Sequence, residues 1–181
     1  MSLLSHERLV ELVEAGVIDA DPENINGASI DITLDNTIMV EHEVSYSSVD
    51  LMRKDTLSML DYKIKEFDTY ILESGQFILA SSCETFNLPD NIACEYKLKS
   101  SLARCGLQHM LAGWCDPGWV NSKLTLEFKN VTQYHDLILR PGMKIGQMVF
   151  FECDPVPSEE SYAVKGQYNN QGGATGSKGL R

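Results

Sequence analysis

Apolar and polar residues alternate with a period of two over much of the chain between residues 30 and 151. Ile30, Ile32 and Leu34 alternate with polar residues, and the same period recurs in residues 124–128. Further short apolar runs bounded by turn residues lie at 70–72, 76–80, 92–98, 137–139 and 145–151. This pattern is typical of short, half-buried strands. The chain is therefore predicted to be mainly β.

One early segment departs from this period. Residues 5–17 place Leu9, Leu12 and Val13 at helical spacing, with Ser5 positioned to cap the segment and Gly16 to end it. No strand–helix alternation and no glycine-rich phosphate loop follows, which argues against Rossmann and P-loop folds. We expect a distorted jelly roll or β-barrel with a short N-terminal helix.

Turn residues suggest where the first long strand ends. Asp35-Asn36 is a typical turn pair and follows the alternating run directly. Asp31 falls on the polar side of that run, where a solvated carboxylate is the ordinary expectation. Residues 41–70 are polar and rich in Ser and Asp, so we expect an insertion of loops with an edge strand possible. Arg140-Pro141-Gly142 is the sharpest predicted turn.

The length of 181 residues is typical of one domain, which we assign to residues 1–160. Residues 161–181 form a separate C-terminal segment that is polar and rich in Gly. Such a segment cannot bury enough apolar surface to fold by itself. Composition leaves two interpretations open, namely a frayed terminus and a flexible lid that orders over a ligand.

Charge and composition exclude several classes of function. The formal net charge of −11 argues against broad binding to nucleic acid or to an anionic membrane, though not against a small polyanion. No apolar run is long enough to span a membrane, and the N-terminus does not resemble a signal peptide. The five Cys residues form no CxxC pair and the four His residues are scattered. We therefore expect a cytoplasmic protein with reduced, mostly packed cysteines and no protein-bound metal.

The most distinctive chemistry lies in residues 97–130. Lys97, Lys99 and Arg104 fall within eight residues and flank Ser100 and Ser101. Hydroxyl groups, backbone N–H groups and a guanidinium can together hold a phosphate chain, especially where a helical turn begins. Basic residues on a surface strand explain the same pattern equally well.

Two acidic residues follow in this stretch. Asp116 precedes Pro117 in a turn, where it could accept a hydrogen bond from a sugar hydroxyl or simply close an Asx turn. Glu127 lies on the polar face of the strand at 124–128, which is either a solvated outer face or the wall of a pocket. Burial in a pocket would raise the pKa of Glu127 and suit it to proton transfer.

Taken together, these motifs resemble the dCTP deaminase family of the dUTPase-like superfamily. The matching pieces occur in family order and span nearly the whole chain: GASIDITL (27–34), SSLARCGL (100–107), AGWCDPGW (112–119), LTLEFKN (124–130), LRPGMKIGQ (139–147) and QYNNQGGATGSKG (167–179). The resemblance implies a homotrimer of distorted jelly-roll subunits with active sites at subunit interfaces. It also implies zinc-independent deamination of dCTP to dUTP and ammonia.

The resemblance assigns roles by position. Glu127 would be the general base and acid, taking a proton from the water that attacks C4 of cytosine and protonating N3. Ser100 and the backbone carbonyl of Ala112 would hold that water, and Arg104 would lie near the reacting centre. The implied substrate-binding residues are Lys99, Ser101, Leu102, Ala103, Asp116, Thr125, Leu126, Tyr162, Gln167 and Gln171. The only implied metal is Mg²⁺ bound to the nucleotide phosphates.

The sequence departs from the usual family pattern at several positions. Lys99 stands where Arg is usual, which removes a bidentate phosphate contact. Gln167 stands at the usual tail Lys, with Lys165 nearby. Gly113-Trp114 resembles the bifunctional branch, which converts dCTP to dUMP and diphosphate. A pure dUTP diphosphatase and a nucleotide-binding protein without turnover are the remaining alternatives, although DPGW and LEF count against the diphosphatase.

Overall fold

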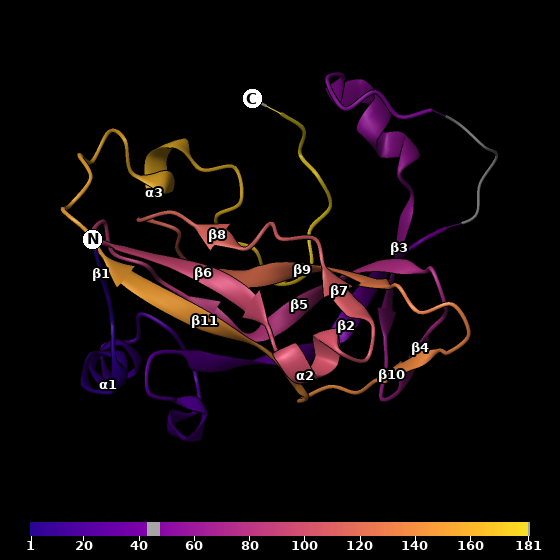
Figure 1. Ribbon diagram of the computed structural model, residues 1–181. Helices are drawn as coiled ribbons and strands as arrows, with labels where there is room; N and C mark the ends of the chain where they lie inside the picture. The colour runs from indigo at the N-terminus through magenta and orange to yellow at the C-terminus, as the bar shows by residue number, and fades with distance from the viewer. Residues whose placement is uncertain (43–47, 181) are drawn as a thin grey trace.

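The computed structural model describes residues 1–42 and 48–180. Within them, nine strands form one curled sheet in the order β7-β9-β5-β2-β11-β6-β8, with β1 on β11 and β3 on β2. A small second sheet pairs β10 with β4. Figure 1 shows the long strands of this sheet running through the body, where β9 pairs with β5 and β6 pairs with β11. The expected mainly β barrel-like fold is confirmed.

The strands have the following bounds: β1 Ser2–Leu3, β2 Ile30–Glu41, β3 Tyr62–Glu66, β4 Tyr70–Leu72, β5 Phe77–Phe86, β6 Ile92–Leu98, β7 Leu107–His109, β8 Trp114–Cys115, β9 Ser122–Asn130, β10 Leu137–Leu139 and β11 Lys144–Glu152. The three α-helices are α1 (His6–Glu14), α2 (Ser100–Ala103) and α3 (Tyr162–Lys165), and two 3₁₀ turns are η1 (Pro22–Asn24) and η2 (Lys54–Met59). All strand pairs are antiparallel.

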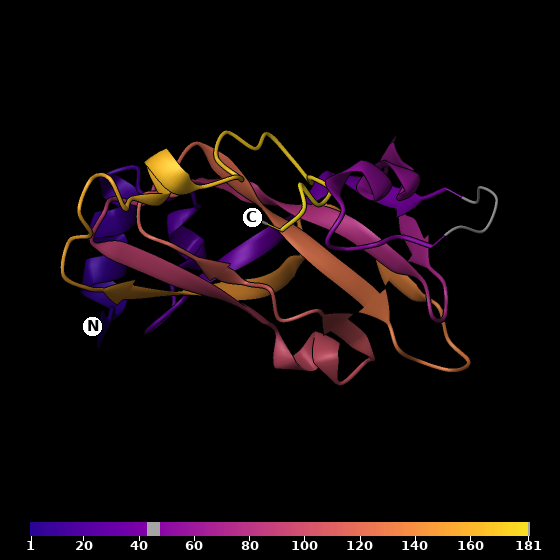
Figure 2. The ribbon, with the colours of Figure 1, turned by 90° about the horizontal axis from the view of Figure 1, so that it is seen from above.

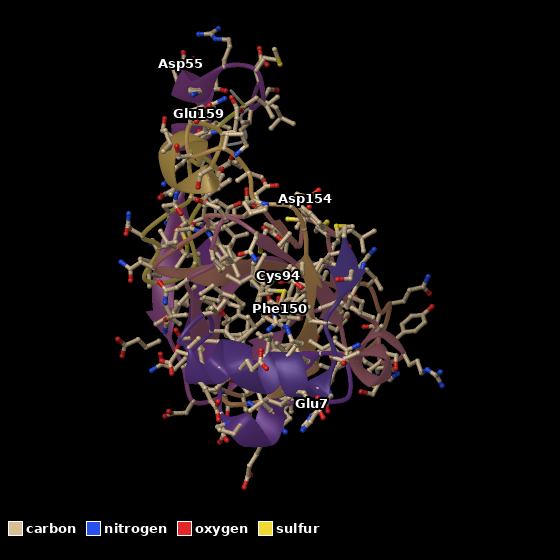
Figure 3. The ribbon with its side chains drawn as sticks, turned by 90° about the vertical axis from the view of Figure 1, so that its left-hand side faces the viewer. Glu7, Asp55, Cys94, Phe150, Asp154 and Glu159 are labelled. Carbon is tan, nitrogen blue, oxygen red and sulfur yellow. The ribbon has the colours of Figure 1, made fainter. Side chains whose placement is uncertain are left out.

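The hydrophobic core lies inside the curl of the sheet. On β9, the predicted alternation holds, because Leu124, Leu126 and Phe128 are buried while the residues between them are half-exposed. Phe150 on β11 pairs with Cys94 on β6, and both side chains are fully buried. Figure 3 shows these two side chains in the interior of the molecule. Burial of such side chains stabilises the fold by roughly 1.5–3 kcal/mol each.

Helix α1 closes one end of the sheet (Figure 1). Leu9 and Leu12 face the core, as their helical spacing predicts. Ser5 occupies the N-cap position, but its side chain makes no capping hydrogen bond. Gly16 follows the helix with φ +71°, a left-handed conformation that ends helices and favours Gly. The predicted helix is confirmed, although it ends three residues earlier than expected.

The prediction that Asp35-Asn36 ends the first strand is wrong. Strand β2 continues through both residues to Glu41, and its pairing with β5 shifts register between Leu34 and Ile38. A bulge therefore absorbs these residues without interrupting the strand. The turn at Arg140-Pro141-Gly142 does form, with the N–H of Met143 donating to the Arg140 carbonyl at 3.3 Å.

Residues 48–66 form an arm at the far end of the molecule from α1 (Figure 1). The arm contains η2 and the strand β3, which pairs with β2 along the sheet edge. The possible edge strand in this region is confirmed, while residues 43–47 lie outside the described part of the chain. No helix in the described residues is long and apolar enough to cross a membrane.

All five cysteines are free thiols. Cys94 and Cys115 are buried and directly opposed on β6 and β8, and burial raises the pKa of the Cys94 thiol. Cys83 and Cys105 are exposed, and Cys153 is intermediate. The expectation that the cysteines are mostly packed is therefore wrong for the two exposed thiols.

Candidate active site

A cavity of about 500 Å³ lies beside the polar face of β9. Its size is within the range of small-molecule sites. The lining residues come from the arm, β5, the segment around β8, β9 and the C-terminal segment: Leu60, Tyr62, Phe77, Leu79, Ala112, Trp114, Cys115, Asp116, Trp119, Leu124, Thr125, Glu127, Tyr162, Tyr168, Gln171, Thr175 and Ser177. Six of the predicted site residues are in this set, namely Ala112, Asp116, Thr125, Glu127, Tyr162 and Gln171.

Strand β9 supplies one wall of the cavity. Thr125 and Glu127 are two residues apart, so the strand turns both side chains to the same face. Leu79 on β5 pairs directly with Glu127 and also lines the cavity. The polar face of this strand therefore borders a pocket, which answers the alternative that the sequence left open. The Glu127 side chain is 25% exposed.

Glu127 has one basic neighbour. The Nε2 atom of His109 lies 3.2 Å from its Oε2 atom. His109 ends strand β7, which pairs with β9 on the side away from β5. The imidazole is only 4% exposed. A buried imidazole beside a carboxylate is a common arrangement at sites that move protons.

The DPGW motif forms a tight turn at the cavity. Gly118 has φ +85°, and the N–H of Trp119 donates to the Asp116 carbonyl at 3.2 Å. A Cβ at Gly118 would overlap the Ser161 hydroxyl, so the turn also allows close packing against the segment before α3. The indole N–H of Trp114 donates to Asp116 Oδ1 at 2.9 Å. Asp116 thus presents a carboxylate at the cavity with one oxygen already oriented.

The C-terminal segment forms another wall of the cavity. It runs over the body beside the arm (Figure 2). The N–H of Thr175 donates to Thr125 Oγ1 at 3.1 Å, and the indole N–H of Trp119 donates to the Tyr168 carbonyl at 2.8 Å. Gly179 packs so tightly against Lys54 and Leu57 of the arm that a Cβ would come within 2.7 Å of Lys54. The described part of the segment is therefore docked on the body and is not frayed.

Buried polar atoms without a hydrogen-bond partner are concentrated at this site. In the described residues they are Tyr96 OH, His109 Nε2, Glu127 Oε2 and Gln171 Oε1. Glu127 and Gln171 line the cavity, His109 contacts Glu127, and the Tyr96 ring packs at a tilt against His109 with ring centroids 4.7 Å apart. Because buried polar groups are nearly always satisfied, such a cluster marks a place built to receive a partner.

The phosphate-binding residues predicted around α2 lie elsewhere in the subunit. Ser100, Ser101, Ala103 and Arg104 are exposed on α2 and at its end, and none lines the cavity. Figures 1 and 2 show α2 on the opposite side of the body from the C-terminal segment. The predicted site residues therefore form two separate groups within one chain.

Lys99, the N-cap residue of α2, is held by Asp31. Its Nζ donates to Asp31 Oδ1 at 2.7 Å, and Asn26 donates to the same oxygen at 2.9 Å. The expectation that Asp31 is solvated is wrong, since it is 5% exposed. Burial alone would raise the pKa of Asp31, but the hydrogen bonds from Lys99 and Asn26 and the charges of Lys99 and Lys144 outweigh it and lower that pKa.

Three further predicted residues are placed by the structure. Leu126 is fully buried on the core face of β9, so only its backbone could face a ligand there. Gln167 donates to the Gly179 carbonyl at 3.4 Å within the C-terminal segment. Leu102 packs against the core beneath α2. Within residues 1–42 and 48–180, no three His, Cys, Asp or Glu side chains are grouped so that they could hold a metal ion.

Sequence reasoning missed His109 and the arm residues Leu60 and Tyr62. His109 carries no motif, and only the pairing of β7 with β9 brings it to Glu127. The arm residues lie in the stretch with the weakest pattern. The alternation of β5 could have identified Leu79, because antiparallel pairing places it beside Glu127.

Comparisons with known proteins identify the family of this chain. A family model described as dCTP deaminase-like matches residues 3–153. A curated relative named "dCTP deaminase, dUMP-forming", from Corynebacterium efficiens, is 35% identical over 98% of this chain and 94% of that protein. Proteins of the same name from Rhodococcus jostii and Bifidobacterium longum are 36% and 37% identical, each over 97% of this chain and 95% and 93% of their own length.

Among solved structures, the 2'-deoxycytidine 5'-triphosphate deaminase from Agrobacterium tumefaciens has the same fold. It superposes with a TM-score of 0.64 at 20% identity, over 82% of this chain. This chain spans 47% of the length of that one.

Proposed function

The chain belongs to the dCTP deaminase-like family, and from that premise we propose that it deaminates dCTP to dUTP and ammonia in pyrimidine deoxynucleotide metabolism. The observation that carries the proposal is the position of Glu127, a carboxylate at the wall of a ligand-sized cavity with a buried imidazole 3.2 Å away. Asp116 is the other carboxylate that lines the cavity, and it is already engaged by Trp114.

Glu127 would move the protons of the reaction. It takes a proton from water as the oxygen adds to C4 of cytosine, and it delivers that proton to N3. The resulting tetrahedral carbon carries a hydroxyl and an amino group. Glu127 then transfers the hydroxyl proton to the amino group, the C4–N bond breaks, and ammonia leaves as the C4 carbonyl forms. One carboxylate therefore serves each step, and water supplies the new oxygen.

The remaining cavity groups would orient the nucleotide. Ala112, Asp116 and Thr125 line the cavity. The backbone carbonyl of Ala112 would accept a hydrogen bond from the attacking water, Asp116 would accept one from the deoxyribose hydroxyl, and Thr125 would adjoin the base. Tyr162 and Gln171 belong to the C-terminal segment that lines the cavity. We assign this segment, residues 161–181, as a lid on the domain formed by residues 1–160. Mg²⁺ would enter as part of the substrate, bound to the triphosphate oxygens.

We further propose that a second copy of the chain completes the site. Ser100 on α2 and Arg104 at its C-terminal end are exposed, and in the described part of the chain neither lines the cavity beside β9. In a homotrimer with interfacial sites, α2 of one copy would meet the cavity of the next and bring Ser100 to the water and the KSSLAR run to the phosphates. This assembly accounts for the separation of the two groups.

The bifunctional reaction, dCTP to dUMP and diphosphate, is the second candidate. The relatives reported above are named as dUMP-forming. Close packing also explains why position 113 is Gly, because a Cβ there would come within 2.9 Å of the Tyr96 carbonyl oxygen. A larger residue at this position would therefore collide with the Tyr96 backbone.

The test is incubation of the purified protein with dCTP and Mg²⁺, followed by chromatography of the nucleotides and measurement of ammonia. Accumulating dUTP supports the first candidate, and dUMP with diphosphate supports the second. Glu127→Gln should lower kcat for ammonia release by about a thousandfold. Glu66→Gln, an exposed change on β3, is the matched control and should retain activity.

Three outcomes would overturn this proposal. Ammonia release at the original rate by Glu127→Gln would remove Glu127 from the mechanism. Hydrolysis of dUTP without any action on dCTP would make the chain a pure dUTP diphosphatase. Binding of dCTP without turnover of either nucleotide would leave a nucleotide-binding protein that has kept the fold.

A further inference from the structure

Strand pairing fixes His109 against the Oε2 side of the Glu127 carboxylate. Strand β7 pairs with β9 so that His109 is opposite Phe128, the residue after Glu127. The N–H of Met110 also donates to the Glu127 carbonyl at 3.2 Å. These backbone contacts hold the two strands together at His109 and Glu127. The sheet, and not a loop, therefore sets the 3.2 Å separation of His109 Nε2 and Glu127 Oε2.

The imidazole is also held by aromatic packing on two sides. The Tyr96 ring packs against it at a tilt of 58° with ring centroids 4.7 Å apart, and Phe128 meets it edge-on at 5.9 Å. Tyr96 can take this position because Gly146 lies behind its ring, where a Cβ would overlap the ring atoms. His109 therefore has little freedom to turn away from Glu127.

The burial of the two facing atoms points to a specific role. His109 Nε2 and Glu127 Oε2 are both buried, and neither has another hydrogen-bond partner among the described residues. A buried carboxylate oxygen without a hydrogen-bond partner keeps its full desolvation penalty. If Nε2 carries the imidazole proton, a small side-chain adjustment satisfies both atoms at once.

We propose that His109 is a positioning residue for Glu127, donating its Nε2 proton to Oε2 so that Oε1 alone exchanges protons with the water and the nucleotide. The proposal rests on the deaminase function proposed above and adds a residue to it. His109 itself does not line the cavity, so it acts through Glu127 and does not touch the substrate. Its effect belongs to the chemical step, because a carboxylate that can rotate loses the alignment that proton transfer needs.

The decisive comparison uses two substitutions at position 109. His109→Phe keeps a ring between Tyr96 and Phe128 but has no N–H group, whereas His109→Gln supplies an N–H donor at nearly the same reach. We expect kcat for ammonia release from dCTP to fall about 30-fold in His109→Phe with KM changed by less than about threefold. His109→Gln should recover kcat to within about fivefold of the original protein.

Controls separate this effect from a loss of folding. His135 is exposed, and His135→Phe should leave kcat unchanged. Thermal unfolding of each variant is recorded alongside the kinetics. If His109→Phe retains full kcat, or if His109→Gln loses as much kcat as His109→Phe while both remain folded, the positioning role is wrong.

The outcome for His109 is distinguishable from the outcome for the proposed function. If the original protein releases ammonia and His109→Phe does so equally well, only the role of His109 fails. If the original protein releases no ammonia from dCTP, the deaminase proposal itself fails, and His109 then has no chemical step to support.

Discussion

Two groups of residues that the sequence assigns to one site lie in different parts of the subunit. The cavity group on β9, the DPGW turn and the C-terminal segment surrounds a space of about 500 Å³. The α2 group is a four-residue helical turn whose polar side chains are exposed. Among the described residues, the first group has a place for a ligand but no Lys or Arg side chain lining it, and the second has cations that do not line this cavity. Each group is therefore incomplete where it stands, which is the expected appearance of a site shared between copies.

The strongest test of this comparison mixes two inactive proteins. Glu127→Gln removes the cavity group and Arg104→Ala removes the α2 group, so each alone should lose at least about a hundredfold in activity. Co-expressed in equal amounts, they should recover about a quarter of the original activity, because one site in four then combines an intact Glu127 with an intact Arg104 from its neighbour. Ammonia release by the co-purified mixture measures this directly.

If both groups acted within one chain, no hybrid site would be intact and the mixture would stay inactive. A chain carrying both substitutions is the matched control, since it should not recover in any combination with itself. Sedimentation of the mixture shows whether the copies have assembled.

Removing the end of the C-terminal segment should weaken the cavity group alone. Truncation after Asn170 deletes Gln171, Thr175 and Ser177 from the cavity wall and the hydrogen bond from Thr175 to Thr125. We expect KM for dCTP to rise about tenfold, because contacts with the nucleotide worth about 1.4 kcal/mol are lost. Steady-state kinetics and nucleotide binding check this. An unchanged KM would indicate that the segment is packing and not a lid.

Breaking the ion pair between Lys99 and Asp31, which anchors α2, should affect the α2 group and leave the cavity group intact. Asp31→Asn removes the carboxylate that holds Lys99 at 2.7 Å, and we expect a loss of about 2 kcal/mol in the free energy of unfolding. Urea denaturation measures the loss. Asp55→Asn on the exposed arm, labelled in Figure 3, is the control and should change stability by less than about 0.5 kcal/mol. A loss no larger than that of the control would contradict the anchoring role.

The smallest expected effect is a pH dependence of opposite sign at two buried carboxylates. The pKa of Asp31 is lowered from its ordinary value of 3.8, so its stabilisation is present above that pH and is lost as the pH falls through the lower folded value. Burial raises the pKa of Glu84 from 4.5, although hydrogen bonds from Thr33 oppose it. Its contribution is therefore fully present below pH 4.5 and declines as the pH rises through the raised value.

The two variants Asp31→Asn and Glu84→Gln separate these contributions. Relative to the original protein, the deficit of Asp31→Asn should grow with pH near pH 4, whereas any deficit of Glu84→Gln should shrink above pH 4.5. Each slope is at most about 1.4 kcal/mol per pH unit for one proton. Unfolding curves recorded across this pH range measure both deficits in unfolding free energy. If the two deficits changed with pH in the same direction, the ion pair with Lys99 would not determine the pKa of Asp31.

The strands were the most predictable part of the molecule. The alternation of β9 correctly placed Leu124, Leu126 and Phe128 inside, because a strand exposes alternate residues whatever its neighbours are. The end of β2 was not predictable from Asp35-Asn36, because a bulge against β5 tolerates residues that otherwise favour a turn. Asp31 was misplaced for a similar reason, since its partner Lys99 is 68 residues away.

By itself, the sequence determined the periodic elements, the tight turns at Gly118 and Gly142, and the identity of the chemical groups in residues 97–130. These features depend on neighbours along the chain and on the order of motifs. Only the tertiary structure decided which face of β9 borders a cavity, that the C-terminal segment and the arm enclose it, and that His109 meets Glu127. It also separated α2 from the cavity. Such contacts arise when a curled sheet brings distant segments together, and local sequence patterns carry little information about that pairing.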